Sequence, residues 1–93
     1  MLIGSMQVEL HIPACHSLKE KRYVLKSLVS RIKNSFNVSV AEVGFQEKWQ
    51  RACIGISIVS NSSRMIDSVL DKICVLIERD DRLEIIDTVK EVL

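Results

Sequence analysis

The stretch of sequence that decides the fold is PACHSLKEKR, residues 13–22. It follows an alternating run that is typical of a strand, and it opens the most basic helix of the chain. Ser17 and Glu20 have the spacing of a capping box, in which the Ser side chain accepts from the N–H three residues on and the Glu reaches back to the N–H of the cap. The helix is therefore predicted to begin near Leu18. Because a helix start gathers unpaired N–H groups and a partial positive charge, an anion would be sought here first.

Outward from this stretch, the period of the apolar residues distinguishes strands from helices. Alternation indicates a half-buried strand, and recurrence at three- and four-residue steps indicates an amphipathic helix. The predicted elements are, in order, a strand at 5–12, a helix at 18–34, strands at 38–43 and 49–60, a helix at 63–79 and a strand at 83–92. The alternation of the last strand slips at Ile85 and Ile86, which predicts a β-bulge.

The order β-α-β-β-α-β predicts an α+β fold, the ferredoxin-like split βαβ sandwich. With right-handed crossovers, its antiparallel sheet has the spatial order 4-1-3-2 and carries both helices on one face. Residues 1–93 are expected to form a single domain, because 93 residues provide for one core layer. The aliphatic face of the third strand, which consists of Ala52, Ile54, Ile56 and Ile58, is predicted to lie in that core.

Composition narrows the class of protein. Aromatic residues make up only 4% of the chain, so the core must be aliphatic. No apolar run approaches the ~20 residues of a membrane span, and the first residues lack the basic region of a signal peptide. Three widely spaced cysteines, Cys15, Cys53 and Cys74, favour free thiols over a disulfide framework. We therefore expect a cytoplasmic protein with no membrane contact.

The net charge of +1 conceals a strong asymmetry. Residues 17–35 contain six basic residues and one acidic residue, a net charge of +5, whereas the rest of the chain has a net charge of −4. At 100° per residue, four of the helix cations fall within about 60° of one another, which suits a phosphate backbone. The candidate nucleic-acid-binding residues are Lys19, Lys21, Arg22, Lys26 and Lys33. The alternative is an ordinary solvated helix face. The outer sheet face is a poor candidate for RNA, because its strands lack stacking aromatics and carry Glu9.

Four segments together resemble a known family. They are VELHIP at 8–13, SLKEKR at 17–22, NVSVAEVG at 37–44 and WQRA at 49–52, and they resemble the YlxP-like family of small bacterial proteins. The resemblance spans nearly the whole chain and implies a ferredoxin-like fold. The family has no established biochemical activity and no established catalytic residues. Its genes often neighbour those of translation initiation and ribosome maturation factors, which implies a role linked to translation by association only.

Two kinds of active or metal site are less well supported than the basic helix. His11, Cys15 and His16 lie close in sequence and could hold zinc or copper, but the Cys-x-x-Cys pair of ferredoxin-like metal chaperones is broken here. An acylphosphatase-like activity needs a Gly-rich loop with an Arg after the first strand, and residues 13–16 contain neither. We therefore predict no catalytic residues, no metal and no cofactor.

The remaining distinctive side chains have ordinary interpretations. Cys53 and Cys74 are expected to be buried and inert. Trp49 is expected to cover the end of the core, with a partner-binding anchor as the alternative.

The sequence thus favours a non-enzymatic cytoplasmic protein that associates with ribosomal RNA or a ribosomal assembly through the basic helix. The alternative is a protein-interaction module or homodimeric scaffold. A dimer would form first through the small side chains of the outer sheet face.

Overall fold

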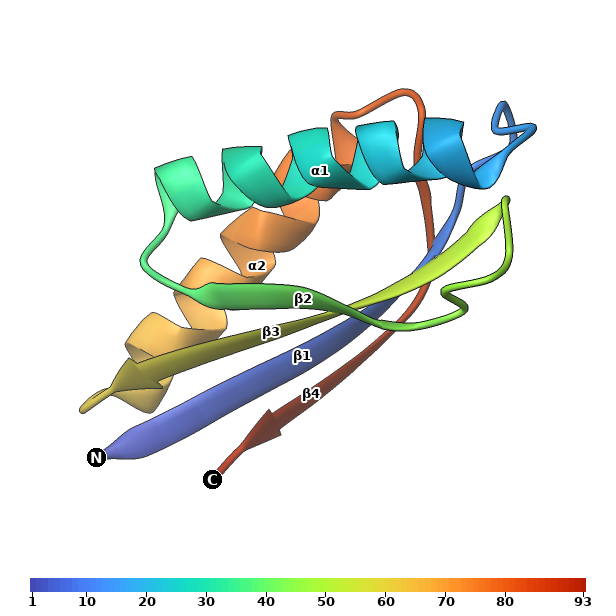
Figure 1. Cartoon of the computed structure of the whole chain (residues 1–93). Helices are drawn as coiled ribbons and strands as arrows, with labels where there is room; N and C mark the ends of the chain where they lie inside the picture. The colour runs from blue at the N-terminus through green and yellow to red at the C-terminus, as the bar shows by residue number, and fades with distance from the viewer.

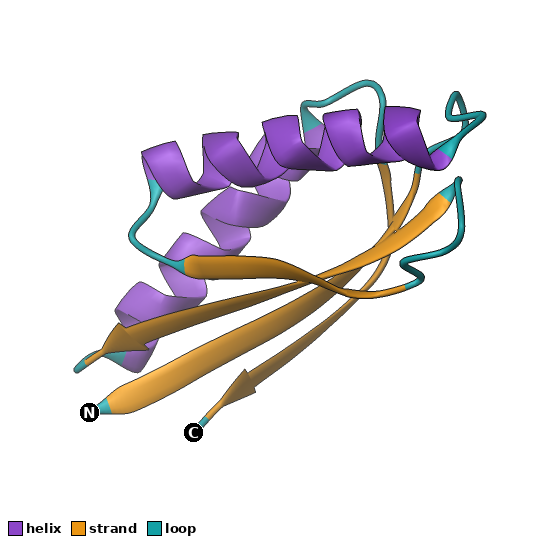
Figure 2. Ribbon diagram, in the orientation of Figure 1, coloured by secondary structure: helices purple, strands orange, loops and turns teal.

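The computed structural model describes residues 1–93 and contains the predicted elements in the predicted order. They are β1 (Leu2–His11), α1 (Leu18–Ser35), β2 (Ser39–Gly44), β3 (Arg51–Ser60), α2 (Ser63–Glu78) and β4 (Glu84–Val92). Figure 1 follows the chain through them, and Figure 2 shows the two helices stacked on a twisted layer of strands.

The four strands form one antiparallel sheet in the order β2-β3-β1-β4, which is the predicted order read from the other edge. β1 and β3 are central and pair along their full length, from Leu2 opposite Ser60 to His11 opposite Arg51. Both helices cover the same face of the sheet (Figure 1). The ferredoxin-like architecture predicted from the sequence is therefore confirmed.

The hydrophobic core lies between the helices and the inner face of the sheet. The predicted aliphatic face of β3 is buried along its whole length, as is the apolar stripe of α2; these residues are Ala52, Ile54, Ile56 and Ile58, then Ile66, Leu70, Ile73 and Ile77. Gly4 lets α2 approach β1, because a Cβ atom at this position would overlap Cγ2 of Ile66. The absence of a side chain at one position of β1 thus sets how closely the second helix packs.

Two irregularities in strand pairing lie toward the edges of the sheet. Between β1 and β4 the register shifts after Glu9, so that Ile86 is the extra residue of the β-bulge that the sequence predicted. Between β2 and β3, Gly44 lies opposite Cys53, which leaves Val43 as an extra residue. This second bulge was not predicted. The side chain of Val43 lies over Gly55, where an added Cβ atom would come within 3.1 Å of Cγ1 of Val43.

The loop between β2 and β3 is longer than the sequence indicated. β3 begins at Arg51, whereas the prediction began it at Trp49. Phe45, the first residue of the loop, has a φ of 58°, in the left-handed region that residues other than Gly seldom adopt. Trp49 is 53% exposed on this loop, so the expectation that it covers the end of the core was wrong.

Candidate nucleic-acid interface

Helix α1 begins at the predicted residue and is capped almost as predicted. The hydroxyl of Ser17 accepts a hydrogen bond from the Glu20 N–H at 3.1 Å. The Glu20 carboxylate, however, accepts from the N–H of His16 at 2.9 Å, one residue before the cap whose N–H we expected it to reach. The reciprocal bonds fix the direction in which the helix leaves the turn.

Four of the predicted cations form an exposed line on α1, defined here as the α1 cation line: Lys19, Arg22, Lys26 and Lys33. They lie on the side of the helix that faces away from the core, and along the axis they span about 21 Å at 1.5 Å per residue. None of the six ion pairs of the structure involves any of them. Their charges are therefore not neutralised by a carboxylate of the same chain.

Lys21 is not part of this line, which corrects the predicted set of five. Its side chain is 1% exposed, and it lies among the buried residues on the underside of α1. Its ammonium lies 2.9 Å from Oε2 of Glu42 on β2 and donates to the carbonyl oxygen of Phe45. A buried ammonium that is already paired cannot contact a phosphate backbone, so Lys21 has a structural role.

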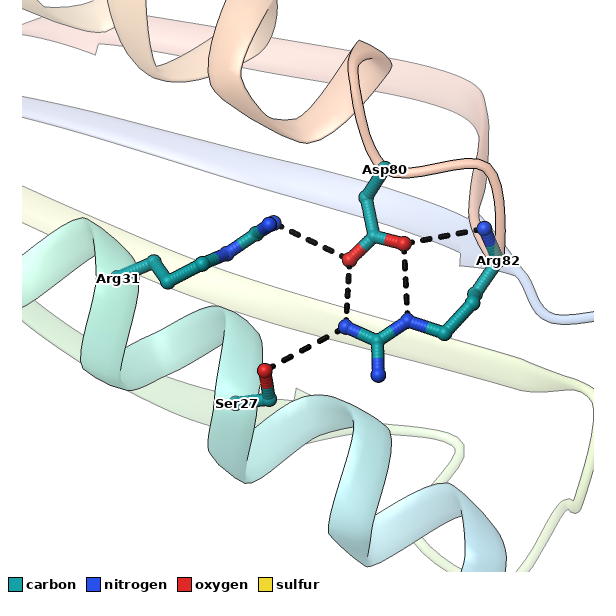
Figure 3. Close-up of polar contacts among 4 residues, drawn as sticks. All are labelled: Ser27, Arg31, Asp80 and Arg82. Atoms are coloured by element: carbon teal, nitrogen blue, oxygen red, sulfur yellow. Dashed lines mark hydrogen bonds and ion pairs between the residues drawn. The ribbon is translucent and has the colours of Figure 1, made fainter.

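Arg31, on the flank of α1 that faces α2, already has an ion-pair partner in the same chain. One of its terminal nitrogens donates to Oδ2 of Asp80 at 3.1 Å. Arg82 donates three hydrogen bonds to the same carboxylate, one from its backbone N–H and two from guanidinium nitrogens (Figure 3). Asp80 is buried in the turn after α2, and the side-chain hydrogen bonds from Arg82 hold its pKa below the usual value despite burial. This cluster joins the turn to the middle of α1, where Arg82 also reaches the hydroxyl of Ser27 at 3.4 Å.

The outer face of the sheet is unfavourable for a polyanion. A hollow of about 220 Å³ lies there, and it is lined in part by the acidic residues Glu9 and Asp87. Phe45 also lines it, an aromatic ring that the strand pattern did not place on this face, but its ring carries the guanidinium of Arg51 at 4.9 Å. Arg51 in turn pairs with Glu9. Any RNA contact is thus better served by α1 than by the sheet.

The residues considered for a metal do not form a site. No group of three or more His, Cys, Asp or Glu side chains is placed to hold a metal ion. His11 pairs with Glu84, Nδ1 to Oε2, at 3.2 Å. Cys15 is buried beneath the start of α1, and this burial raises the pKa of its thiol, which disfavours the thiolate that binds metals.

Cys53 and Cys74 are half-buried, so the expectation that both lie inside the core was wrong.

A second cationic region, between the two helices, was not predicted from the sequence. Lys72 of α2 and Arg79, the residue that caps the C-terminus of α2, line a groove together with Arg31 of α1. The available signal was the pair Val75 and Leu76, which lies outside the buried stripe of α2 and yet is apolar. Which cations flank that pair depends on how the helices cross, and the sequence pattern does not give this.

Comparison with known proteins places the chain in a family. Residues 3–90 match the family model described as "Protein of unknown function (DUF503)". The chain is 40% identical over 83 residues to "Uncharacterized protein YlxP" of Bacillus subtilis (strain 168), an alignment that covers 89% of this chain and 90% of that protein.

Among solved structures, the solution NMR structure of a de novo designed protein with a ferredoxin fold is similar. Its TM-score is 0.57 at 13% identity, over 99% of this chain and 85% of the designed one, so the likeness concerns the fold alone. Neither helix is both long enough and apolar enough to span a membrane. The resemblance drawn from the four segments is confirmed by these matches: the chain belongs to the YlxP-like family, whose model is that of a protein of unknown function, DUF503.

Proposed function

We propose that this protein is a non-enzymatic RNA-binding protein that associates with ribosomal RNA or a ribosomal assembly through the α1 cation line. The observation that carries the proposal is the set of four exposed cations on one side of a helix, none with an ion-pair partner. Each such cation can displace a counterion from a phosphate, and this displacement is the main source of sequence-independent affinity for nucleic acid.

The arrangement of the line also suits a backbone better than a base. The four cations are separated by three, four and seven residues, so they repeat along the helix on one side. Contacts of this kind set the position of the protein on a nucleic acid but carry no sequence information. We therefore expect RNA recognition by charge and shape, without strong sequence preference.

The test is binding of ribosomal RNA, and of isolated ribosomal subunits, across a salt series. Affinity should fall as salt rises. A variant with all four line residues changed to alanine should have a log–log salt slope smaller by up to about 3, at roughly 0.7 for each phosphate that the protein no longer neutralises.

A matched comparison removes the effect of net charge. The Arg22→Ala/Lys26→Ala variant and the Lys48→Ala/Arg64→Ala variant each lack two exposed cations that have no ion-pair partner, and only the first pair lies on the line. Equal weakening by the two variants would contradict a site on α1. If wild type and the variant with all four line residues changed to alanine bind RNA equally well, α1 has no part in the mechanism.

The alternative from another class is a protein-interaction module without a nucleic-acid role. Two observations favour it: Trp49 is 53% exposed, and the outer sheet face exposes apolar side chains, among them Val59 at 63%. Affinity capture with and without nuclease separates the two functions. Partners that persist after nuclease treatment favour the module, whereas disappearance of all partners favours RNA binding.

A further inference from the structure

A groove of about 560 Å³ lies between the C-terminal half of α1 and the C-terminal half of α2, and we define it as the inter-helix groove. Figure 1 shows α1 crossing over α2, with the end of α2 behind the middle of α1. This volume lies within the range of about 300–1,000 Å³ that is typical of ligand pockets. The side chains that matter are three cations and three apolar residues: Arg31, Lys72 and Arg79, then Phe36, Val75 and Leu76.

The apolar residues give the inter-helix groove a surface that water solvates poorly. Phe36 and Leu76 are half-buried and pack against the core, while Val75 is 44% exposed. Val75 is neither part of the buried stripe of α2 nor packed against the core, so the fold does not need it to be apolar. The exposed Val75 and the two half-buried side chains beside it form a small apolar surface that is open to a partner.

The cations give the same groove a net positive charge. Lys72 and Arg79 form no ion pair, and Arg31 uses one terminal nitrogen on Asp80, which leaves its other N–H groups available. No carboxylate lines the groove. Arg31 stands on one wall and the other two cations on the opposite wall, so a bound segment would meet positive charge on both sides.

We propose that the inter-helix groove binds an acidic amphipathic segment of a partner protein. The apolar side chains of that segment would cover Val75, Leu76 and Phe36, and its Asp or Glu side chains would pair with the flanking cations. Lys72 and Arg79 are seven residues apart, or about 10.5 Å along the axis, which matches acidic residues two turns apart on a partner helix. A peptide fits better than RNA, because bases stack on aromatic faces and two of the three apolar residues here are aliphatic.

This site is separate from the α1 cation line and does not depend on it. Counting 100° per residue, Arg31 lies about 180° around the helix from Arg22 and at least about 120° from every other member of the line. The two surfaces can therefore be changed independently. A protein that used both would connect an RNA to an acidic partner protein.

The experiment uses the full chain and two synthetic 16-residue helical peptides. One carries Leu at positions i, i+3, i+4 and i+7 with Glu on the flanks, and the second replaces every Glu with Lys. Binding is followed by amide chemical-shift changes, which identify the residues contacted, and by fluorescence anisotropy. The protein variants are Lys72→Glu/Arg79→Glu and, as a control, Lys48→Glu/Arg64→Glu, whose exposed cations lie outside both the groove and the α1 cation line.

We expect the acidic peptide to shift the amides around Phe36, Val75 and Leu76, and the basic peptide to leave them unshifted. The Lys72→Glu/Arg79→Glu variant should bind the acidic peptide at least tenfold more weakly, and the control variant should bind it within twofold of wild type. Shifts that map elsewhere, no binding of the acidic peptide, or equal weakening by both variants would overturn the proposal.

Ribosomal RNA serves as the second probe and keeps the two proposals apart. RNA that shifts the groove amides while the acidic peptide does not would assign the groove to nucleic acid and overturn the peptide site. Loss of RNA binding in the four-fold alanine variant with unchanged peptide binding supports the groove proposal. Retention of RNA binding in that variant contradicts the proposed role of α1 and leaves the peptide result to decide the groove.

Discussion

The ammonium of Lys21 on α1 lies 2.9 Å from Oε2 of Glu42 on β2. The same ammonium donates to the carbonyl oxygen of Phe45, the first residue of the loop after β2 and one with positive φ. Lys21 therefore joins the buried side of the helix to the end of an edge strand and to a loop in an uncommon conformation. Because the Lys21 side chain is 1% exposed while that of Glu42 is 26% exposed, the two partners do not contribute equally.

The first prediction is that Glu42→Ala destabilises the protein more than Lys21→Met. Removing the carboxylate leaves a buried ammonium with only one acceptor, and we expect the free energy of unfolding to fall by about 2 kcal/mol. Methionine instead fills the same volume with an apolar chain. Oε2 of Glu42 is buried where it faces Lys21, but the side chain is 26% exposed and can turn toward water, so we expect a change below about 1 kcal/mol. Urea unfolding followed by circular dichroism measures both, with Glu47→Ala in the exposed loop as the control. Equal destabilisation would show that the pair does not act as described.

The second prediction is that Lys21→Met leaves RNA affinity unchanged, whereas Lys26→Met weakens it. Both changes remove one positive charge from α1, but only Lys26 is exposed. Because one fewer phosphate is neutralised, the salt slope for Lys26→Met should fall by about 0.7. Filter binding of ribosomal RNA at several salt concentrations gives both slopes. A lower slope for Lys21→Met would mean that the buried ammonium becomes available to RNA.

The third prediction concerns the glycines of the central strands. Gly4→Ala should destabilise by about 1–3 kcal/mol, because its methyl group would overlap Ile66 and force α2 away from β1. Gly55→Ala meets only Val43 on the outer face, at 3.1 Å, and Val43 is 53% exposed and has room to move. The second substitution should therefore destabilise less. Thermal unfolding of the two variants ranks them, and the reverse order would contradict the packing of α2 on Gly4.

The fourth prediction is a pH-dependent contribution of Asp80 to stability. The hydrogen bonds from Arg82 hold the pKa of Asp80 below its usual 3.8. Since the folded-state pKa is lowered, the contribution is fully present above pH 3.8 and is lost as the pH falls through the folded-state pKa. We expect Asp80→Asn to destabilise by about 1–3 kcal/mol at pH 7. The gap to wild type should shrink below about pH 4. Urea unfolding between about pH 3 and pH 7 measures this gap, and a gap that widens on acidification would contradict the assigned sign.

The fold was predictable because the period of two in the strands and the three- and four-residue steps in the helices fit one topology. The alternation of Met6, Val8 and Leu10 marks the buried face of β1, and the slip at Ile85 and Ile86 marks the β-bulge of β4. These are local signals, and the order of the elements leaves few ways to connect them. The bulge at Val43 had no such signal, because one extra residue in a six-residue edge strand hardly disturbs its pattern.

The candidate site was predictable only in part. At 100° per residue, Lys21 falls between Leu25 and Leu28 on the buried side of α1, so the helix wheel held the signal that would have excluded it. The pairing of Arg31 with Asp80, 49 residues apart, had no comparable signal. Such pairs and the inter-helix groove follow from the crossing of the two helices, which depends on packing across the whole core.

The last prediction is that the protein forms a two-fold dimer through the outer face of the sheet. That face exposes the apolar side chains of Val43, Val59 and Val89 around the small residues Gly55 and Ser57. Small residues at its centre permit close approach of a second sheet. A domain of this size gains from burying more apolar area, and two-fold pairing places the same patch on both copies.

Light scattering at micromolar concentration tests this dimer, because a monomer has a mass of 10.6 kDa and a dimer about twice that. Ser57→Arg should return the mass to that of the monomer, since two guanidinium groups would be buried against one another without partners. Ser30→Arg on the exposed side of α1 adds the same charge away from the interface and should leave the dimer intact. A wild-type mass of 10.6 kDa at every concentration would exclude the dimer, and a dimer that survives Ser57→Arg would place the interface on another surface.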